Sequence, residues 1–276
     1  MKRFLLLFAS VIFLGACSQK VKEDIIAIHT PYGTIKVKLY EKTPKHHQNF
    51  MNLVDSRFFD STLFHRVIKG FMIQGGDPDS KHAEPGQLLD DGDTNYKIPF
   101  EYVEEYLNKR GALAAARESD DVNPEKASSA CQFYIVQGKV FTDAGLDSAE
   151  AKRARYTKSF ILMNYLKNAG DSIALKEFQQ SFGKRNIPAI EKTLEQYKNV
   201  IDKEYSKSKP WKLTPKQREI YKTIGGAPHL DGAYTVFGEV ISGMEIVDQI
   251  AAEKCDTNDR PLKDIRIWMS VESRRK

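Results

Sequence analysis

The order of apolar and polar residues predicts a chain that begins as a β domain. In DIIAIHTPYGTIKVKLY, residues 24–40, apolar positions alternate with polar ones on both sides of a turn at Pro31-Tyr32-Gly33. This alternation is typical of strands with one buried face, so the stretch predicts a hairpin that opens an antiparallel sheet. Further strands are predicted within residues 64–77, 111–117, 129–138, 234–240 and 264–272.

Two helices are predicted between these strands. Thr43-Pro44 has the residue types of a helix start, and apolar residues between Phe50 and Val54 follow at helical spacing. We expect this helix to pack on the sheet. A second helix is predicted from Pro99 to Lys109, where the apolar residues share one face.

Residues 142–226 differ in character from the rest of the chain. Amphipathic helices are predicted around 160–166, over 187–205, and from Thr214-Pro215 to Gly225-Gly226. The segment has 17 Lys and Arg against 10 Asp and Glu, so it carries the positive charge of a chain whose formal net charge is +5. Because strand signals resume after it, we interpret it as a basic helical insertion into the β domain. Its basic residues either are only solvated on exposed helix faces or form a surface that binds anionic lipid or a partner. A third interpretation is that the insertion is an oligomerisation element.

The first residues have the profile of an export signal. MKRFLLLFASVIFLGAC has a basic start, an apolar run from Phe4 to Leu14, and small residues before a cysteine, and it is short for a membrane span. The ending from Leu14 to Cys17 resembles a bacterial lipobox, which implies a signal peptide at 1–16, lipidation of Cys17 and a short linker over 17–23. The alternative is an ordinary secretory signal with a chance cysteine.

Residues 64–77, FHRVIKGFMIQGGD, combine a strand-like apolar run with an arginine, a glutamine and three glycines. Strand periodicity places Phe64, Arg66 and Ile68 on one face, and Met72 and Gln74 together after Gly70. An unpaired buried charge costs more than a buried methylene contributes, so these polar residues indicate a functional surface.

This stretch resembles the longest signature of the cyclophilin family of peptidyl-prolyl isomerases. The resemblance continues in GALAAAR, SSACQFYIV and HLDGAYTVFGEVISGMEIVDQI, and covers residues 24 to about 141 and about 227 to 272. It implies a mainly β fold, a closed eight-stranded antiparallel barrel capped by two helices. We therefore divide the chain into a first barrel part at 24–141, the helical insertion at 142–226 and a second barrel part at 227–276.

The resemblance also implies the site. Arg66 aligns with the catalytic arginine of the family, whose guanidinium would act on the prolyl amide nitrogen. The expected substrate-binding residues form an apolar pocket for the proline ring and polar contacts to the peptide backbone. They are Phe71, Met72, Gln74, Ala116, Gln132, Tyr134 and Leu230.

Several positions depart from the family pattern. Tyr134 replaces a pocket phenylalanine, Arg117 stands where many relatives have asparagine, and His229 stands where cyclosporin-sensitive relatives have tryptophan. The resemblance therefore implies that catalysis is kept while drug binding is weak.

Other candidate chemistry is sparse. His46-His47 could suggest a metal site, but no cysteine or carboxylate lies at ligand spacing, and a solvated helix face is the better interpretation. Cys131 lies in a strand-like run and predicts a buried free thiol, although pairing with Cys255 is the alternative. We expect no cofactor, no metal and no nucleic-acid partner.

Together these observations predict a peptidyl-prolyl cis/trans isomerase that is lipid-anchored through Cys17 to a bacterial membrane, with its catalytic domain outside the cytoplasm. Its clients would be proline-containing polypeptides, and its role would be to assist folding in the cell envelope. The alternative is a non-catalytic peptide-binding chaperone or scaffold that uses the same groove and the helical insertion.

Overall fold

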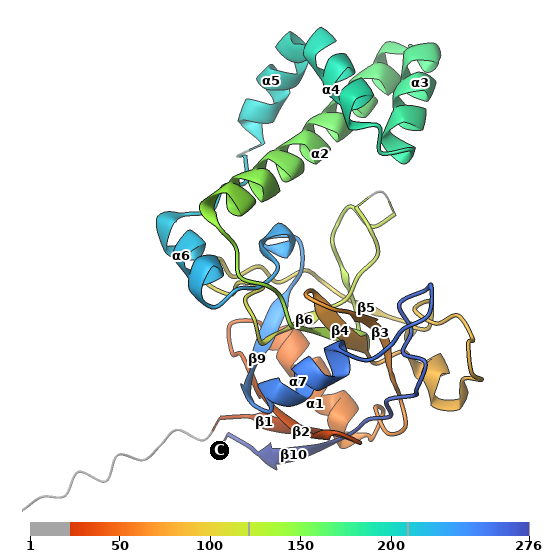
Figure 1. The fold of residues 1–276 in the computed structure, drawn as a ribbon, viewed down its shortest axis with the longest axis vertical. Helices are drawn as coiled ribbons and strands as arrows, with labels where there is room; N and C mark the ends of the chain where they lie inside the picture. The colour runs from red at the N-terminus through yellow and green to blue at the C-terminus, as the bar shows by residue number, and fades with distance from the viewer. Residues whose placement is uncertain (1–22, 121, 209, 276) are drawn as a thin grey trace, which may run out of the picture.

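The computed structural model describes residues 23–120, 122–208 and 210–275. Figure 1 shows a β domain from which a group of helices projects. Eight strands form one antiparallel sheet in the order β10-β1-β2-β9-β6-β8-β4-β3. Their bounds are β1 Ile25–Thr30, β2 Gly33–Leu39, β3 Phe64–Ile68, β4 Met72–Gly75, β6 Ala112–Ala115, β8 Phe133–Val136, β9 Val236–Ser242 and β10 Trp268–Ser273. A separate two-stranded sheet pairs β5 (Lys97–Ile98) with β7 (Ser128–Ser129).

The large sheet curls around the main apolar core, so that alternate strand residues point inward. Rings dominate the centre of this core, where Phe50 contacts Phe59, Phe133 and Phe237 at centroid distances of 5.1 to 5.6 Å. Phe50 comes from α1 (Pro44–Asp55), the helix predicted from Thr43-Pro44. This confirms that α1 packs on the sheet through its apolar face.

The eight antiparallel strands are confirmed, but the sheet is open and does not close into a complete barrel. β3 lies at one end of the sheet, and a loop bonds to the edge that no strand pairs with. The backbone N–H of Phe64 donates to Ile265 O, and that of Val67 donates to Asp259 O. A turn between Asp256 and Arg260, whose backbone groups hydrogen-bond to each other, keeps this loop from extending into a strand. The loop therefore satisfies the edge groups that strand pairing would otherwise use.

The second predicted helix, from Pro99 to Lys109, is wrong: the segment is a loop. Its Glu101 carboxylate accepts hydrogen bonds from the backbone N–H groups of Lys45 and His46 in the first turn of α1. It thereby caps α1, whose N-cap Thr43 makes no side-chain capping bond. The second helix on the main core is instead α7 (Met244–Ala251), which buries Ile246, Val247 and Ile250.

Five helices follow β8 and precede β9, and we call α2–α6 the helical segment. They are α2 Asp143–Ala169, α3 Ser172–Gly183, α4 Ile187–Gln196, α5 Lys198–Lys207 and α6 Pro215–Thr223. Figure 1 shows α2 leading away from the β domain toward α3, α4 and α5, while α6 lies beside the domain. Short 3-10 turns lie at Pro78–His82 and Pro228–Leu230.

The single helix predicted over 187–205 is two helices that meet at Tyr197. The break lets Ile190 of α4 and Ile201 of α5 enter one small core with Leu162 and Phe178. A second cluster at the base of the segment includes Tyr221 and joins it to the β domain. The helix predicted from Thr214-Pro215 is α6, and it starts with a complete capping box between Thr214 and Gln217.

Two further predictions concern cysteines and the N-terminus. Cys131 is a buried free thiol, as predicted, and burial raises its pKa to about 12. Cys255 is also unpaired. The predicted signal peptide and Cys17 lie outside the described residues. Within the described residues, no helix is long and apolar enough to cross a membrane.

Candidate active site

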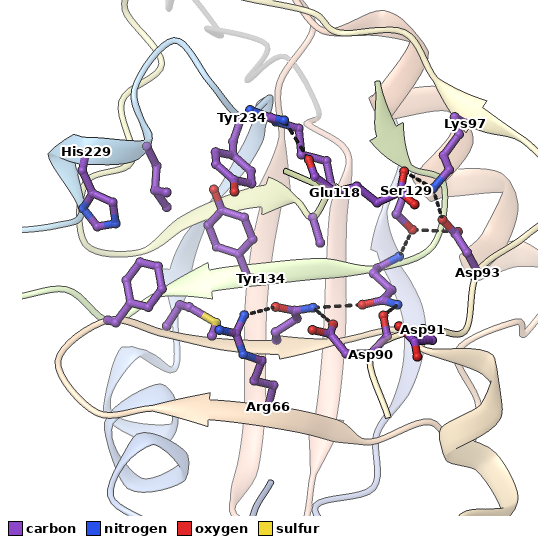
Figure 2. Close-up of a pocket in the computed structure, with 17 residues that line it drawn as sticks. Arg66, Asp90, Asp91, Asp93, Lys97, Glu118, Ser129, Tyr134, His229 and Tyr234 are labelled. Carbon is purple, nitrogen blue, oxygen red and sulfur yellow. Dashed lines mark hydrogen bonds and ion pairs between the residues drawn. The ribbon is translucent and has the colours of Figure 1, made fainter. Parts of the chain in front are cut away.

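A groove of about 550 Å³ lies on the outer face of the sheet, where β3, β4, β6 and β8 are neighbours. Figure 2 shows its lining side chains. The structure brings all eight predicted site residues together here, although they come from three distant parts of the sequence. These residues are Arg66, Phe71, Met72, Gln74, Ala116, Gln132, Tyr134 and Leu230.

Arg66 reaches the groove because β3 contains a bulge. The pairing with β4 shifts register between Phe64 and Arg66, so the two residues do not share a face as simple alternation predicted. Phe64 and Val67 both enter the main core, while Arg66 lines the groove with a side chain that is 36% exposed. A bulge beside a site redirects a side chain in this way without breaking the sheet.

The guanidinium of Arg66 is held loosely from two sides. Its NH1 group donates to Gln74 Oε1 at 3.3 Å, and its Nε lies 3.9 Å from Asp259 Oδ2. Both contacts are long, so most of its five N–H donors are available to a ligand. The side chain is therefore oriented toward the groove and still able to bind.

The polar end of the groove is a connected set of amides. Gln74 Nε2 donates to Gln132 Oε1 at 2.9 Å and to Asp90 Oδ1 at 2.5 Å. Gln132 Nε2 in turn donates to the backbone oxygens of Asp90 and Gly92. Because both N–H groups of Gln74 are used, its oxygen must face Arg66, and the network orients the arginine. A contact of these amides with a substrate backbone stays a prediction.

The apolar end of the groove is formed by Phe71, Met72, Tyr134 and Leu230, which belong to one apolar cluster. The ring of Phe71 lies 5.3 Å from that of His229, between centroids, and the ring of Tyr134 meets Tyr234 edge to face at 5.9 Å. These side chains give the groove that also contains Arg66 a small surface of low polarity, and Figure 2 labels Arg66, Tyr134 and His229 among the residues that line it.

Sequence reasoning missed the acidic rim of the groove. Four acidic residues line it: Asp90, Asp91, Asp93 and Glu118. The three aspartates belong to a loop with no strand or helix pattern that could have placed them.

Arg117, a departure from the family pattern, has a structural role. Its Nε donates to Ala233 O at 2.7 Å and its guanidinium lies 4.8 Å from the Tyr234 ring centroid, so it holds the loop that carries Tyr234.

His46 is not on a solvated helix face, which corrects the sequence interpretation. Its ring is buried, with Nδ1 at 2.7 Å from Glu101 Oε2 and Nε2 at 3.0 Å from Ser128 Oγ. His47 is partly buried beside Asp24, at 3.0 Å. No group of three or more potential metal ligands is present among the described residues.

The burial of His46 predicts a pH dependence of stability. Burial lowers its pKa in the folded protein, in spite of Glu101, whereas the unfolded chain titrates near the ordinary value of about 6.5. The contribution of neutral, buried His46 to stability is thus fully present above pH of about 6.5. It decreases as the pH falls below this value, because His46 then gains a proton in the unfolded chain more readily than in the folded protein. Thermal unfolding between pH 7 and pH 5 should therefore show a smaller decline for His46→Gln than for the wild type. Equal declines would assign the acid sensitivity to other groups.

Comparisons with known proteins agree with this geometry. A family model described as cyclophilin type peptidyl-prolyl cis-trans isomerase/CLD matches residues 25–157 and 215–271. A human protein named peptidyl-prolyl cis-trans isomerase-like 3 is 35% identical over 88% of this chain and 91% of its own length. A Streptococcus pyogenes protein named as a bifunctional phosphatase/peptidyl-prolyl cis-trans isomerase is 26% identical over 88% of this chain, which spans 37% of that relative.

A solved structure has the same fold. The crystal structure of a Cryptosporidium parvum cyclophilin type peptidyl-prolyl cis-trans isomerase superposes with a TM-score of 0.52 at 20% identity, and covers 92% of this chain and 99% of its own. The family model matches more than half of the chain and leaves only the segment 158–214 between its two parts. The chain therefore belongs to the cyclophilin family of peptidyl-prolyl cis-trans isomerases and is an isomerase of that class.

Proposed function

We propose that this protein catalyses rotation about X-Pro peptide bonds in exported polypeptides and so assists their folding in the bacterial cell envelope. The observation that carries the proposal is the position of Arg66, whose guanidinium lies at the boundary between a polar network and an apolar pocket. A proline ring fits the apolar end, and its amide then lies within reach of the arginine.

The chemistry needs no covalent step. Partial double-bond character gives the peptide bond a rotation barrier of about 18–20 kcal/mol. When the bond twists, the prolyl nitrogen becomes pyramidal and its lone pair can accept a hydrogen bond. A guanidinium N–H of Arg66 at that nitrogen binds the twisted state more strongly than either planar state, and this difference lowers the barrier.

The remaining groove residues hold the substrate. Phe71, Met72, Tyr134 and Leu230 would bind the proline ring and keep water from the reacting bond. Gln74, Gln132 and Ala116 would contact the peptide backbone on either side. With the proline ring fixed, rotation occurs in the residue before it, and Arg66 needs no large movement during the reaction.

The envelope location rests on the sequence of residues 1–17, which has the profile of an export signal and ends at Cys17. We expect a cell expressing the full chain to incorporate labelled fatty acid into the protein and to retain it in the membrane fraction. Cys17→Ala should lose the label and appear in the soluble envelope fraction. Label retained by Cys17→Ala would contradict lipidation at this residue.

A peptide-binding chaperone is the second candidate, and the helical segment favours it. The segment has its own small core and leaves two large apolar side chains at the surface. These are Tyr165 and Ile173, and the exposed fraction of Ile173 is 74%. A denatured client whose slow refolding phase is prolyl isomerisation separates the two candidates. An isomerase accelerates that phase at a small molar fraction of the client. A chaperone suppresses client aggregation in proportion to its concentration, and Arg66→Ala leaves that suppression intact.

A further inference from the structure

A buried chain of hydrogen bonds connects the helical segment to the apolar end of the groove. The hydroxyl of Tyr134, whose ring forms part of the groove wall, donates to Asn108 Oδ1 at 2.8 Å. Asn108 Nδ2 donates to Asp231 Oδ1 at 3.1 Å, and the other carboxylate oxygen accepts from the Tyr221 hydroxyl at 2.6 Å. Tyr221 belongs to α6, so the connection ends in the helical segment.

Each member of this connection depends on the next. All four side chains are buried, and Tyr221 and Asn108 are 0% exposed. A buried hydroxyl or amide without a partner loses its hydration and gains nothing in return. Asn108 is fixed twice, because its backbone N–H also donates to Asp231 Oδ1 at 2.8 Å. The orientation of the Asn108 amide, and with it the acceptor for Tyr134, is thus set by Asp231.

Asp231 lies next to a second groove residue, Leu230. The backbone oxygen of Asp231 accepts a hydrogen bond at 2.5 Å from Arg153 of α2. The guanidinium of Arg153 also lies 4.5 Å from the Trp211 ring centroid. The helical segment therefore contacts this residue twice, through Tyr221 at the carboxylate and through Arg153 at the backbone. A phenylalanine in place of Tyr134 would need none of these polar partners, so the connection serves the hydroxyl that this chain carries.

Building on the proposed isomerase function, we propose that Tyr221 and Asp231 are positioning residues for the proline pocket. Through Asn108 they fix the ring of Tyr134, and through the chain itself they fix Leu230. Helix α6 is then a structural part of the substrate pocket, and the helical segment contributes to substrate binding although none of its described residues lines the groove.

A double-mutant cycle tests this proposal, with Tyr221→Phe and Tyr134→Phe made singly and together in the fragment that starts at Ser18. Each substitution removes only a hydroxyl. Loss of one buried hydrogen bond corresponds to about a threefold to tenfold change in binding. We expect Tyr221→Phe to raise KM for a proline tetrapeptide by that factor with kcat unchanged, and to raise it by a smaller factor when Tyr134 is already phenylalanine, because only the connection through Leu230 then remains.

The control is Tyr197→Phe in the helical segment, where the described residues offer the hydroxyl no hydrogen-bond partner, and it should leave KM unchanged. Equal effects of Tyr221→Phe in both backgrounds, or no effect in either, would overturn the proposal, because a residue that only stabilises the fold gives no dependence on the Tyr134 hydroxyl. If Tyr221→Phe does not fold, as judged by near-ultraviolet circular dichroism, Asp231→Asn replaces it in the cycle, because Asp231 is the second positioning residue of the proposal. An inactive, folded wild type would instead refute the proposed function.

Discussion

Replacement of Arg66 with alanine is expected to reduce kcat/KM for prolyl isomerisation by about 10²- to 10³-fold, the usual cost of removing one preorganised donor to a transition state. The fold should be unchanged, because Arg66 lies at the groove surface and its two contacts, to Gln74 and Asp259, are long. The loss should fall on kcat, since the guanidinium acts on the twisted bond and the proline ring binds elsewhere.

Two further variants make this prediction specific. Lys69→Ala removes a positive charge from the exposed turn that follows β3 and should keep wild-type kinetics. Arg66→Lys keeps the charge but loses the planar set of donors, so its activity should lie between those of the wild type and Arg66→Ala. Equal losses in Lys69→Ala and Arg66→Ala would show that the net charge near the groove matters and that the geometry does not.

Gly226→Ala is expected to destabilise the protein by about 3 kcal/mol or more. Gly226 has φ +149°, and a Cβ there would lie 2.4 Å from Asn108 O and 2.7 Å from Lys109 Cα. These are backbone atoms and cannot rotate away. The residue lies where the chain returns from α6, bridged to both Lys109 and Lys139. Thermal unfolding should show a midpoint lowered by about 6–12 °C, on the scaling for domains above 150 residues.

Gly170→Ala is the matched control for this substitution. Gly170 ends α2 with φ +74°, but a Cβ there meets no atom within 4 Å. The cost is then only the left-handed backbone conformation, about 1–2 kcal/mol. If the two variants unfold at the same temperature, close packing at the junction of the helical segment adds nothing to stability.

Sequence patterns predicted which residues line the groove better than they predicted the local structure that positions them. Residues 64–77 contain Arg66, Met72 and Gln74 in one contiguous signature, so a resemblance could identify them together. The bulge that turns Arg66 away from Phe64 was not predictable, because strand periodicity assumes uniform pairing, whereas a bulge depends on the partner strand. The acidic rim at Asp90 was missed for a related reason: a loop has no period that would place it against distant strands.

The helix predictions failed where tertiary contacts compete with local pattern. The segment from Pro99 to Lys109 has a helical arrangement of apolar residues, yet it remains a loop in which Glu101 caps α1. The amphipathic pattern over 187–205 is real on both sides of Tyr197, but one straight helix could not bring Ile190 and Ile201 into the same core. The sequence shows the Tyr134 hydroxyl only as a departure from phenylalanine, because its partner Asn108, and Asp231 beyond that partner, lie far from it in the sequence.

The most direct test of the role of Arg66 is exchange between the cis and trans forms of a tetrapeptide with one X-Pro bond, measured by NMR with catalytic amounts of the fragment from Ser18 onward. We expect accelerated exchange with the wild type and Lys69→Ala, and loss of most of that acceleration with Arg66→Ala. A folded wild type that does not accelerate exchange, or an Arg66→Ala variant as fast as the wild type, would contradict the central role given to Arg66.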